Sequence, residues 1–421
     1  MWVLFDLDGT LTQSEEGIWK TIRHTADKMG FPEPDEAVLR QCIGPPLTWS
    51  FQTLMGMSKE QADQALVIYR ERYNTVGCFE NRVYPGIRAV LKRLRKSGAH
   101  LGIVTGKPEK PTSRILDHFG ITPFLETVVC ATDGHAEKDA LIRKALPADP
   151  GEVWMVGDRR FDMEGAVLAG VHGLGAAWGY GSEEELLAAG AEKIARTPRE
   201  IADMLCPDTP WERGAFLSVE GMDGSGKGTQ IARLQDTLDR FGFEVILCRE
   251  PGGTPIGEKI RGILLDRENK GMTDETEALL YAASRAQLVR EVIRPAVAEG
   301  KVILCDRFVD SSVAYQGGGR MLGVDRVLRI NEPAVDGTMP DLTVWLDIDH
   351  HTAMARRCAA SEPDRMEMEN DGFHTRTEQA YRELIAREPG RFLTVNADQD
   401  RDAVAAEAAR GVLGRLMEAE R

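Results

Sequence analysis

Residues 219–230 read "VEGMDGSGKGTQ", a glycine-rich turn that ends in a lysine. The apolar run "AFLSVEG" leads into it, and a segment of helical period, "GTQIARLQDTLDRFG", follows. Gly221, Gly226 and Lys227 occupy the fixed positions of the pattern G-x-x-x-x-G-K. Between a strand and a helix, such a turn holds phosphate with successive backbone N–H groups, and the lysine neutralises it. The stretch therefore predicts a nucleotide phosphate-binding loop.

Short apolar runs alternate with helical segments on both sides of this loop, which favours parallel α/β sheets. The predicted strands are "WVLFDLD", "LGIVTG", "TVVCATD" and "VWMVGD", then "AFLSVEG", "EVILCRE", "KVILCDR", "LTVWLDI" and "RFLTVN". Apolar residues at helical spacing predict a crossover helix over 86–98. Two prolines and a glycine in "CPDTPWERG" break the pattern between the two halves.

We therefore expect two domains of different α/β folds. The N-terminal domain covers 1–205 and carries an inserted helical cap at about 14–80, cut by "GPP" (44–46). A linker spans 206–213, and the C-terminal domain covers 214–421.

Composition narrows the function classes. The chain of 421 residues carries a net charge of −15 and no basic stripe, which argues against a nucleic-acid polymer as partner. Its seven cysteines are scattered without a C-x-x-C pair, as expected for reduced thiols. No signal-peptide pattern is present, and no segment approaches the roughly 18 apolar residues of a membrane span. We expect a cytoplasmic protein.

Polar side chains follow successive predicted strands of the first half. They are Asp6 and Asp8 in "DLDGT", Thr105 in "TGK", Lys138 at the start of a helix, and Asp158 and Asp162 in "GDRRFD". A single D-x-D is an ordinary turn, but four signals at strand ends predict a site at the carboxyl edge of the sheet. A carboxylate nucleophile, oxygen ligands for Mg²⁺, a lysine and a hydroxyl suit phosphate-ester hydrolysis.

This set resembles the haloacid dehalogenase-like phosphatases over about residues 1–205, in particular the phosphoglycolate-phosphatase-like branch with a small helical cap. The resemblance implies a Rossmann-like parallel sheet, with Asp6 as nucleophile and Asp8 as general acid/base. It implies phosphate contacts from Thr105 and Lys138. The implied Mg²⁺ ligands are Asp6, Asp8, Asp158 and Asp162. One departure is Gln13, where relatives often carry aspartate.

Three motifs decide between kinases that use such a loop. "REPGGT" (249–254), "YAASRAQ" (281–287) and "DRFVDSSVAYQGGGR" (306–320) each couple arginine with small or aromatic residues, a composition that suits a phosphorylated nucleobase acceptor. Their order and spacing resemble those of the thymidylate kinases over essentially all of 214–421. The resemblance implies a P-loop nucleoside-monophosphate-kinase sheet and ATP-dependent phosphorylation of dTMP to dTDP.

The resemblance also assigns residues. ATP would be held by Gly221, Met222, Asp223, Gly224, Ser225, Gly226, Lys227, Gly228 and Thr229. Bound dTMP would meet Arg249 and Arg307 at its phosphate, Tyr281, Arg285, Ser312 and Gln316 at its base, and Asp223 and Tyr315 at its sugar. Relatives usually carry phenylalanine where Tyr281 stands.

Catalytic roles follow from the same resemblance. Lys227 would act on the phosphates, and Asp306 would sit near Mg²⁺ and the reacting phosphates. Gly224 stands where some relatives carry an arginine, so a lid at about 355–376 would supply it. Arg356, Arg357 and Arg365 are available there, and Arg365 in "DRME" is the favoured one. Position 228 is glycine instead of the usual Ser/Thr ligand of Mg²⁺, which leaves the hydroxyl of Thr229 as a substitute.

Several alternatives stay open from the residues. "GKGTQ" also ends adenylate-kinase loops, so the acceptor could be another nucleoside monophosphate. The N-terminal domain could be a non-catalytic regulatory or binding module. If the N-terminal domain is a phosphatase, its substrate could be a nucleotide from the pool that the kinase uses. The resemblance further implies a homodimer formed through the kinase half.

Overall fold

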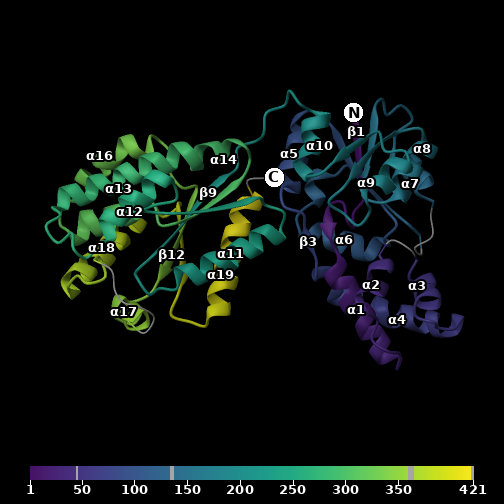
Figure 1. Ribbon diagram of the computed structural model, residues 1–421, viewed down its shortest axis with the longest axis horizontal. Coiled ribbons are helices and arrows are strands. Elements are labelled where there is room, and N and C mark those ends of the chain that lie inside the picture. Colours follow the sequence, from purple (N-terminus) through teal and green to yellow (C-terminus); the bar gives the residue numbers. More distant parts are fainter. Residues whose placement is uncertain (44–45, 133–136, 359–364, 419–421) are drawn as a thin grey trace. The chain divides into compact units, whose positions relative to one another are not determined.

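The computed structural model describes residues 1–43, 46–132, 137–358 and 365–418. Gly44 and Pro45 of the "GPP" break and residues 359–364 of the expected lid lie outside the described part of the chain. The chain divides into two compact units (Figure 1). Unit 1 comprises 1–210 and 239–243, and unit 2 comprises 211–238 and 244–421.

Unit 1 is built on a parallel sheet with the strand order β5-β4-β1-β6-β7-β8. Its strands are β1 (Trp2–Phe5), β4 (His100–Thr105), β5 (Thr127–Cys130), β6 (Val153–Gly157), β7 (His172–Ala176) and β8 (Lys193–Ala195). The four runs predicted in the first half are all strands of this sheet. Since β1 lies between β4 and β6, Leu4 pairs in register with both Gly102 and Met155. The residues that follow these central strands therefore meet at one edge.

The helices that cover this sheet follow the apolar pattern of the sequence. They are α5 (Ile87–Lys96), α6 (Glu109–His118), η2 (Thr122–Phe124), α7 (Lys138–Ala145), α8 (Arg160–Ala169), α9 (Glu183–Ala188) and α10 (Pro198–Leu205). The helix predicted over 86–98 is α5, which buries Ile87, Val90, Leu91 and Leu94. The core beneath these helices includes fully buried Leu4, Val104 and Met155.

A group of helices is inserted after β1, and Figure 1 shows it gathered beside the sheet of unit 1. Its elements are α1 (Glu15–Lys28), α2 (Glu36–Gln41), α3 (Leu47–Thr53), α4 (Lys59–Thr75) and η1 (Gly77–Phe79). The short strands β2 (Thr12–Gln13) and β3 (Arg82–Val83) pair antiparallel at the two ends of the insertion. This pairing holds the entry and exit of the cap together, close to the ends of the sheet strands.

Unit 2 has a parallel sheet with the order β10-β11-β9-β12-β13. Its strands are β9 (Ala215–Gly221), β10 (Val245–Arg249), β11 (Val302–Asp306), β12 (Leu342–Asp347) and β13 (Phe392–Asn396). All five are among the runs predicted from the sequence. The phosphate-binding loop follows β9, the central strand, whose neighbours β11 and β12 border it on either side.

Helices cover both faces of this sheet. They are α11 (Lys227–Arg240), α12 (Pro255–Leu265), α13 (Asp274–Leu288), α14 (Arg294–Ala298), α15 (Val309–Ser312), α16 (Val324–Val335), α17 (His350–Cys358), α18 (Asp371–Arg387) and α19 (Arg401–Glu418). Figure 1 shows α11 and α19 together on one side of the sheet, and α13, α14 and α16 on the other. Two π-helical segments, η3 (Val289–Ile293) and η4 (Val313–Gly319), extend α13 and α15.

A buried ion pair fastens the edge strand β13 to this framework. Arg391, just before β13, binds both carboxylate oxygens of Asp310 at 2.6 and 2.8 Å. Asp310 lies in α15 and is almost fully buried. Because a buried carboxylate is costly without a partner, this bidentate contact holds α15, and with it the start of η4, in place.

Two sequence expectations concern the whole chain. The six cysteines whose side chains are described are free thiols. Among the described residues, no helix is long and apolar enough to cross a membrane.

Candidate active sites

Three carboxylates converge at the carboxyl edge of the unit 1 sheet. Asp6 follows β1 and Asp158 follows β6, the neighbouring strand, while Asp162 lies in the first turn of α8. One oxygen of each carboxylate lies within 4.8 Å of the other two, and all three residues are buried. Burial, reinforced by the Asp162 carboxylate, raises the pKa of Asp6 to about 7 and also raises that of Asp158. A cation that enters this cluster would therefore be stabilised.

Lys138 supplies the positive charge of this cluster. Its Nζ lies 2.6 Å from Asp6 and 2.6 Å from Asp162. Burial disfavours its charged form, but the carboxylates of Asp162 and Asp6 outweigh this and raise the pKa of Lys138. The lysine is thus protonated and ties β1 to α8 through the first residue of α7.

Asp158 is held by contacts on two sides. Thr10 Oγ1 donates to one of its oxygens at 3.1 Å, and the Tyr180 N–H donates to the other at 2.8 Å. Gly9, at φ +88°, faces it so closely that a Cβ at Gly9 would lie 2.2 Å from an Asp158 oxygen. A glycine is therefore required at this position for both conformation and space.

Asp8 stands apart from the three converging carboxylates. One of its oxygens lies 2.8 Å from Lys107 Nζ, which also donates to the hydroxyl of Tyr73 in the cap helix α4 at 2.9 Å. The other oxygen, Oδ1, is buried and has no hydrogen-bond partner among the described residues. Thr105 lies at the end of β4, where its buried hydroxyl accepts from the Lys107 N–H. Asp8 and Thr105 are thus linked to each other through Lys107 and do not belong to the group of three carboxylates.

The turn between β9 and α11 has the shape of an anion cradle. Gly224 and Gly226 both adopt φ of +90°, which turns successive N–H groups inward. Lys227, the first residue of α11, donates to the carbonyls of Gly221 and Met222 at 2.9 and 3.1 Å. Ser225 Oγ is buried without a hydrogen-bond partner among the described residues. Gly228 and Thr229, in contrast, are exposed on the first turn of the helix.

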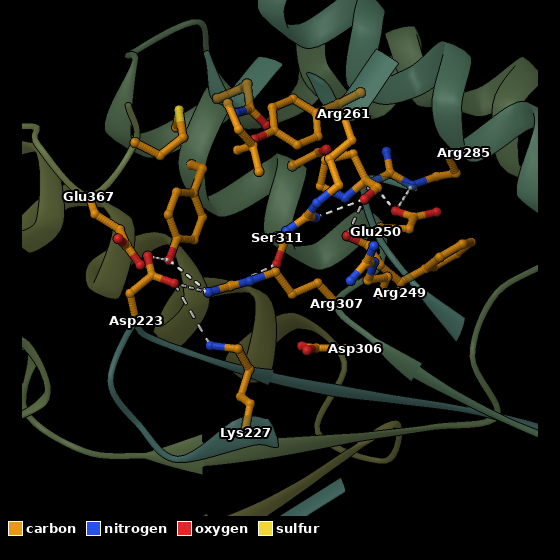
Figure 2. A pocket seen from close by; sticks show the side chains of 18 residues that line it. Asp223, Lys227, Arg249, Glu250, Arg261, Arg285, Asp306, Arg307, Ser311 and Glu367 are labelled. Carbon is orange, nitrogen blue, oxygen red and sulfur yellow. Dashed lines mark hydrogen bonds and ion pairs between the residues drawn. The ribbon is translucent and has the colours of Figure 1, made fainter. Parts of the chain in front are cut away.

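A cavity of about 340 Å³ opens beside this turn. Figure 2 shows Lys227 and Asp306 at one side of it and a group of arginines at the other. Its lining includes most of the residues predicted for the acceptor and the transfer step, namely Asp223, Lys227, Arg249, Tyr281, Arg285, Asp306, Arg307, Ser312, Tyr315 and Gln316. A second hollow of about 670 Å³ shares Arg249 and Asp306 with it and is also lined by Gly228.

Arg307 joins the two sides of this cavity. Its guanidinium pairs with Asp223 of the loop and donates to Ser311 at 3.1 Å, while Tyr315 donates to Asp223 at 2.7 Å (Figure 2). Burial opposes ionisation of Asp223, but Arg307 and Lys227 outweigh it and lower the pKa of Asp223 to about 2. Burial, with the positive charge of Arg307, lowers the pKa of Lys227 to about 8. The site is thus charged before any ligand enters.

Arg249 and Arg285 differ in how far their side chains are buried and in how many partners hold them. Arg249 is about half exposed and pairs with Glu258 at 3.0 Å. Arg285 is buried, and its guanidinium binds Glu250, Asn331 and the Phe308 carbonyl. Burial raises the pKa of Glu250 to about 7, against the lowering effect of Arg285. Arg285 is therefore rigidly placed at the wall of the cavity, whereas Arg249 can reorient.

The Asp306 carboxylate of unit 2 lies in the cavity beside the phosphate-binding turn. Asp306, at the end of β11, has a buried Oδ1 without a hydrogen-bond partner among the described residues, and it lines the cavity with Lys227. An unsatisfied carboxylate oxygen beside a phosphate cradle fits a Mg²⁺-bound phosphate.

Arg365, predicted as the lid arginine, is absent from the lining residues of the cavity. It pairs with buried Glu277 at 2.7 Å and donates to the Leu264 carbonyl.

The kinase half of the chain is similar to known proteins. Residues 219–408 match the family model described as thymidylate kinase. The thymidylate kinase of Limosilactobacillus fermentum is 49% identical over 190 residues, which cover 44% of this chain and 89% of that protein. The thymidylate kinase of Halothermothrix orenii is 49% identical over 208 residues, covering 49% and 99%. The chain belongs to the thymidylate kinase family.

The first half matches a different family. Residues 3–176 match the model described as haloacid dehalogenase-like hydrolase. A crystal structure of a predicted phosphatase from Clostridium acetobutylicum is 36% identical with a TM-score of 0.45, covering 49% of this chain and 98% of that one. The chain thus joins a thymidylate kinase half to a half that matches the haloacid dehalogenase-like hydrolases, as the sequence motifs predicted.

Sequence reasoning missed several residues at the two sites. In unit 1, Lys107 pairs directly with Asp8, and Tyr73 accepts a hydrogen bond from the same lysine. In unit 2 the cavity is also lined by Glu250, Arg261, Ser311 and Glu367. Lys107 belongs to "TGK" and Glu250 to "REPGGT", so both lay inside motifs already singled out. Tyr73 had no such signal, because its helix joins the site only through the cap fold.

We predict that Gly9→Ala destabilises unit 1 much more than Gly30→Ala. Both glycines have positive φ, but a Cβ at Gly30 meets nothing within 4 Å. Gly30→Ala should cost about 1 kcal/mol of backbone strain, while the clash with Asp158 should bring Gly9→Ala to roughly 2–5 kcal/mol. Urea unfolding of the full chain measures both. Equal losses would show that the Asp158 contact imposes no constraint.

Proposed function

We propose that the kinase half transfers the γ-phosphoryl group of ATP to dTMP, giving dTDP. Membership of the thymidylate kinase family carries this proposal, and the cavity chemistry supports it. The phosphate cradle at Gly221–Lys227 would hold ATP, and Arg249 and Arg307 would bind the acceptor phosphate. Mg²⁺ near Asp306 would mask phosphate charge when bound.

The sugar and base of the acceptor would meet the other wall. Asp223 and Tyr315, already in contact, would accept the 3′-hydroxyl and crowd the 2′ position. Tyr281 would stack on thymine, and Arg285 would hydrogen-bond its edge, with Ser312 and Gln316 nearby. Arg365 would act only after it leaves Glu277, which makes its engagement a separate step from substrate binding.

A substrate panel tests this assignment. With ATP and Mg²⁺ held constant, we expect the kcat/KM of the full chain to be highest for dTMP when it is compared with AMP, UMP and dGMP. ADP release is measured with phosphoenolpyruvate and pyruvate kinase, whose product pyruvate is reduced by lactate dehydrogenase with loss of NADH absorbance. A preference for AMP would overturn the proposal in favour of an adenylate-kinase-like acceptor.

We further predict that ATP binding takes up a proton at alkaline pH. Lys227 has a pKa lowered to about 8 in the free protein, so it is mostly neutral at about pH 8.5 and protonated at about pH 6.5. Phosphates placed beside it restore the charged form. Calorimetry in buffers of different ionisation enthalpy should therefore show uptake near pH 8.5 and little near pH 6.5.

Lys227→Arg is the matched control for this measurement. The guanidinium stays protonated at both pH values, so the variant should bind ATP without alkaline proton uptake. Uptake that persists in the variant would assign the proton to another group.

We propose that the N-terminal half hydrolyses a small phosphomonoester through an aspartyl-phosphate. The observation that supports it is the buried group of Asp6, Asp158 and Asp162, whose oxygen donors fit Mg²⁺ and in which burial raises the pKa of Asp6 and of Asp158. When bound, Mg²⁺ would screen the charge of the phosphate from the attacking carboxylate. Asp8 would lie outside this ligand set as the proton donor and acceptor.

The chemical steps would use this chain's carboxylates. An Asp6 oxygen attacks phosphorus, the bond from phosphorus to the ester oxygen breaks, and Asp8 gives its proton to the leaving alcohol. Asp8 then takes a proton from water, which attacks phosphorus and releases Asp6 and inorganic phosphate. Lys138 and Thr105 would hold the phosphate oxygens, and Lys107 would keep Asp8 oriented toward the leaving group.

Substitution of the nucleophile tests this half. In the full chain with Mg²⁺, Asp6→Asn should lower p-nitrophenyl phosphate hydrolysis roughly 1,000-fold or more, because the amide cannot form the acyl phosphate. Asp149→Asn, in an exposed loop, is the control and should keep wild-type turnover. A wild-type chain inactive against a broad phosphate panel would instead favour a non-catalytic binding module.

Two further expectations stay predictions. A homodimer formed through the kinase half is checked by light scattering on the full chain. A cytoplasmic location is checked by cell fractionation.

A further inference from the structure

Two adjacent histidines of unit 2 meet two carboxylates away from the cavity. His350 and His351 begin α17, directly after β12, and Asp371 and Glu378 lie in α18. Consecutive residues of a helix normally point about 100° apart. Here the two imidazole rings lie against each other at an angle of 36°, with their centroids 4.0 Å apart. Both rings therefore face the same neighbour on α18.

That neighbour is the Asp371 carboxylate. His350 Nε2 lies 3.1 Å and His351 Nδ1 3.4 Å from the same oxygen of Asp371. Ligands about 2.0–2.1 Å from a tetrahedral zinc ion are separated by about 3.3 Å. The two separations agree with that edge length, and 3.4 Å is long for an N–H···O hydrogen bond. Both nitrogens thus lie at ligand-like separations from one Asp371 oxygen, and the ligand atoms of the three residues lie within 4.8 Å of one another.

Glu378 sets which nitrogen of His350 is available. Its Oε2 lies 2.8 Å from His350 Nδ1, while its Oε1 accepts from Arg382 at 2.9 Å. In the neutral ring with Nδ1–H given to Glu378, the Nε2 lone pair of His350 faces the Asp371 oxygen, and a cation between the two atoms, either a proton or a metal ion, satisfies both. A carboxylate behind the far nitrogen is also the usual second contact of a metal-binding histidine.

We propose that His350 Nε2, His351 Nδ1 and Asp371 bind a divalent transition-metal ion such as Zn²⁺. Imidazole nitrogen selects zinc, cobalt or nickel over Mg²⁺, which prefers oxygen ligands. His351 and Asp371 are each 68% exposed, so the ion can enter from solvent and water can complete its coordination. His350 is only 9% exposed, which anchors the site to the body of unit 2.

A second set of possible ligands, Asp349, His350 and Glu378, competes for the same histidine. The carboxylate oxygens of Asp349 and Glu378 already have hydrogen-bond partners. Asp349 accepts from the Thr352 N–H as the N-cap of α17, and Glu378 is held by Arg382 and by the His350 ring. In the described part of the chain, the Asp371 carboxylate contacts only the two imidazoles. The set with Asp371 is therefore the favoured one.

A bound ion would join the first turn of α17 to the first turn of α18. Its ligands would thus come from two helices that are separate in the sequence. The site would then be a structural one, independent of the Mg²⁺ of catalysis. Burial lowers the pKa of His350 but its two carboxylates outweigh this and raise it, so a proton is the natural competitor of the metal at low pH.

Zinc titration of the chelator-treated full chain tests the proposal. Millimolar Mg²⁺ is kept present so that oxygen-only sites such as Asp6, Asp158 and Asp162 are already filled. Titration calorimetry at neutral pH should show one Zn²⁺ bound per chain. Thermal unfolding with Zn²⁺ present should show a higher apparent unfolding temperature. Co²⁺ should bind with visible absorption bands typical of nitrogen and oxygen ligands.

Variants locate the ion. His351→Gln removes an exposed ligand and should weaken Zn²⁺ binding at least 100-fold, and Glu378→Gln, which leaves all three ligands, should weaken it roughly 10–100-fold. His172→Gln removes an exposed histidine that contacts Glu192 in unit 1, and should change nothing. The metal-free unfolding temperature checks that each variant folds. No binding in the presence of Mg²⁺, or equal binding by wild type and His351→Gln, would overturn the proposal.

Discussion

Burial of charge at the carboxyl edges of two parallel sheets is the constraint that organises both units. In unit 1 three carboxylates crowd together, and Lys138 holds the cluster by pairing with two of them. In unit 2 Asp223 needs Arg307, and buried Glu250 needs Arg285. Because a buried ion without a partner costs several kcal/mol, these pairs fix loop conformations before any ligand is present. The reactive groups are thus placed by the same contacts that keep the sheet edges folded.

Most of the framework could be predicted from the sequence. Apolar runs such as "KVILCDR" are strands of parallel sheets because both faces are covered, and polar residues that follow them fall at one edge. The strand β7 escaped notice because "HGLGA" is too rich in glycine to form an apolar run. The acidic residues of the first half could likewise be placed at one sheet edge because they follow predicted strands, and the adjacency of β1 and β6, known from the structure, brings Asp6 and Asp158 together.

Contacts between distant side chains could not be predicted in this way. Arg365 matched the position of a lid arginine, yet its guanidinium pairs with Glu277, a nearly fully buried carboxylate 88 positions earlier. That pairing satisfies Glu277 together with Arg320, so local sequence gives no sign of it. Tyr73 reaches Lys107 only because the pairing of β2 and β3 sets the cap against the sheet. Motifs indicate which residues are candidates for a site, whereas tertiary folding decides which side chains contact them.

The ion pair between Asp310 and Arg391 has a consequence for synthesis on the ribosome. Asp310 is made 81 residues before its partner, and α15 cannot bury it favourably until Arg391 has emerged. At about 5–20 residues per second, that leaves several seconds in which the acceptor wall of the kinase stays unfinished. The sheet of unit 1 is complete once β8 has been made, so the phosphatase sheet can form while the kinase is still being translated. The order of the two enzymes along the chain therefore also sets the order in which they mature.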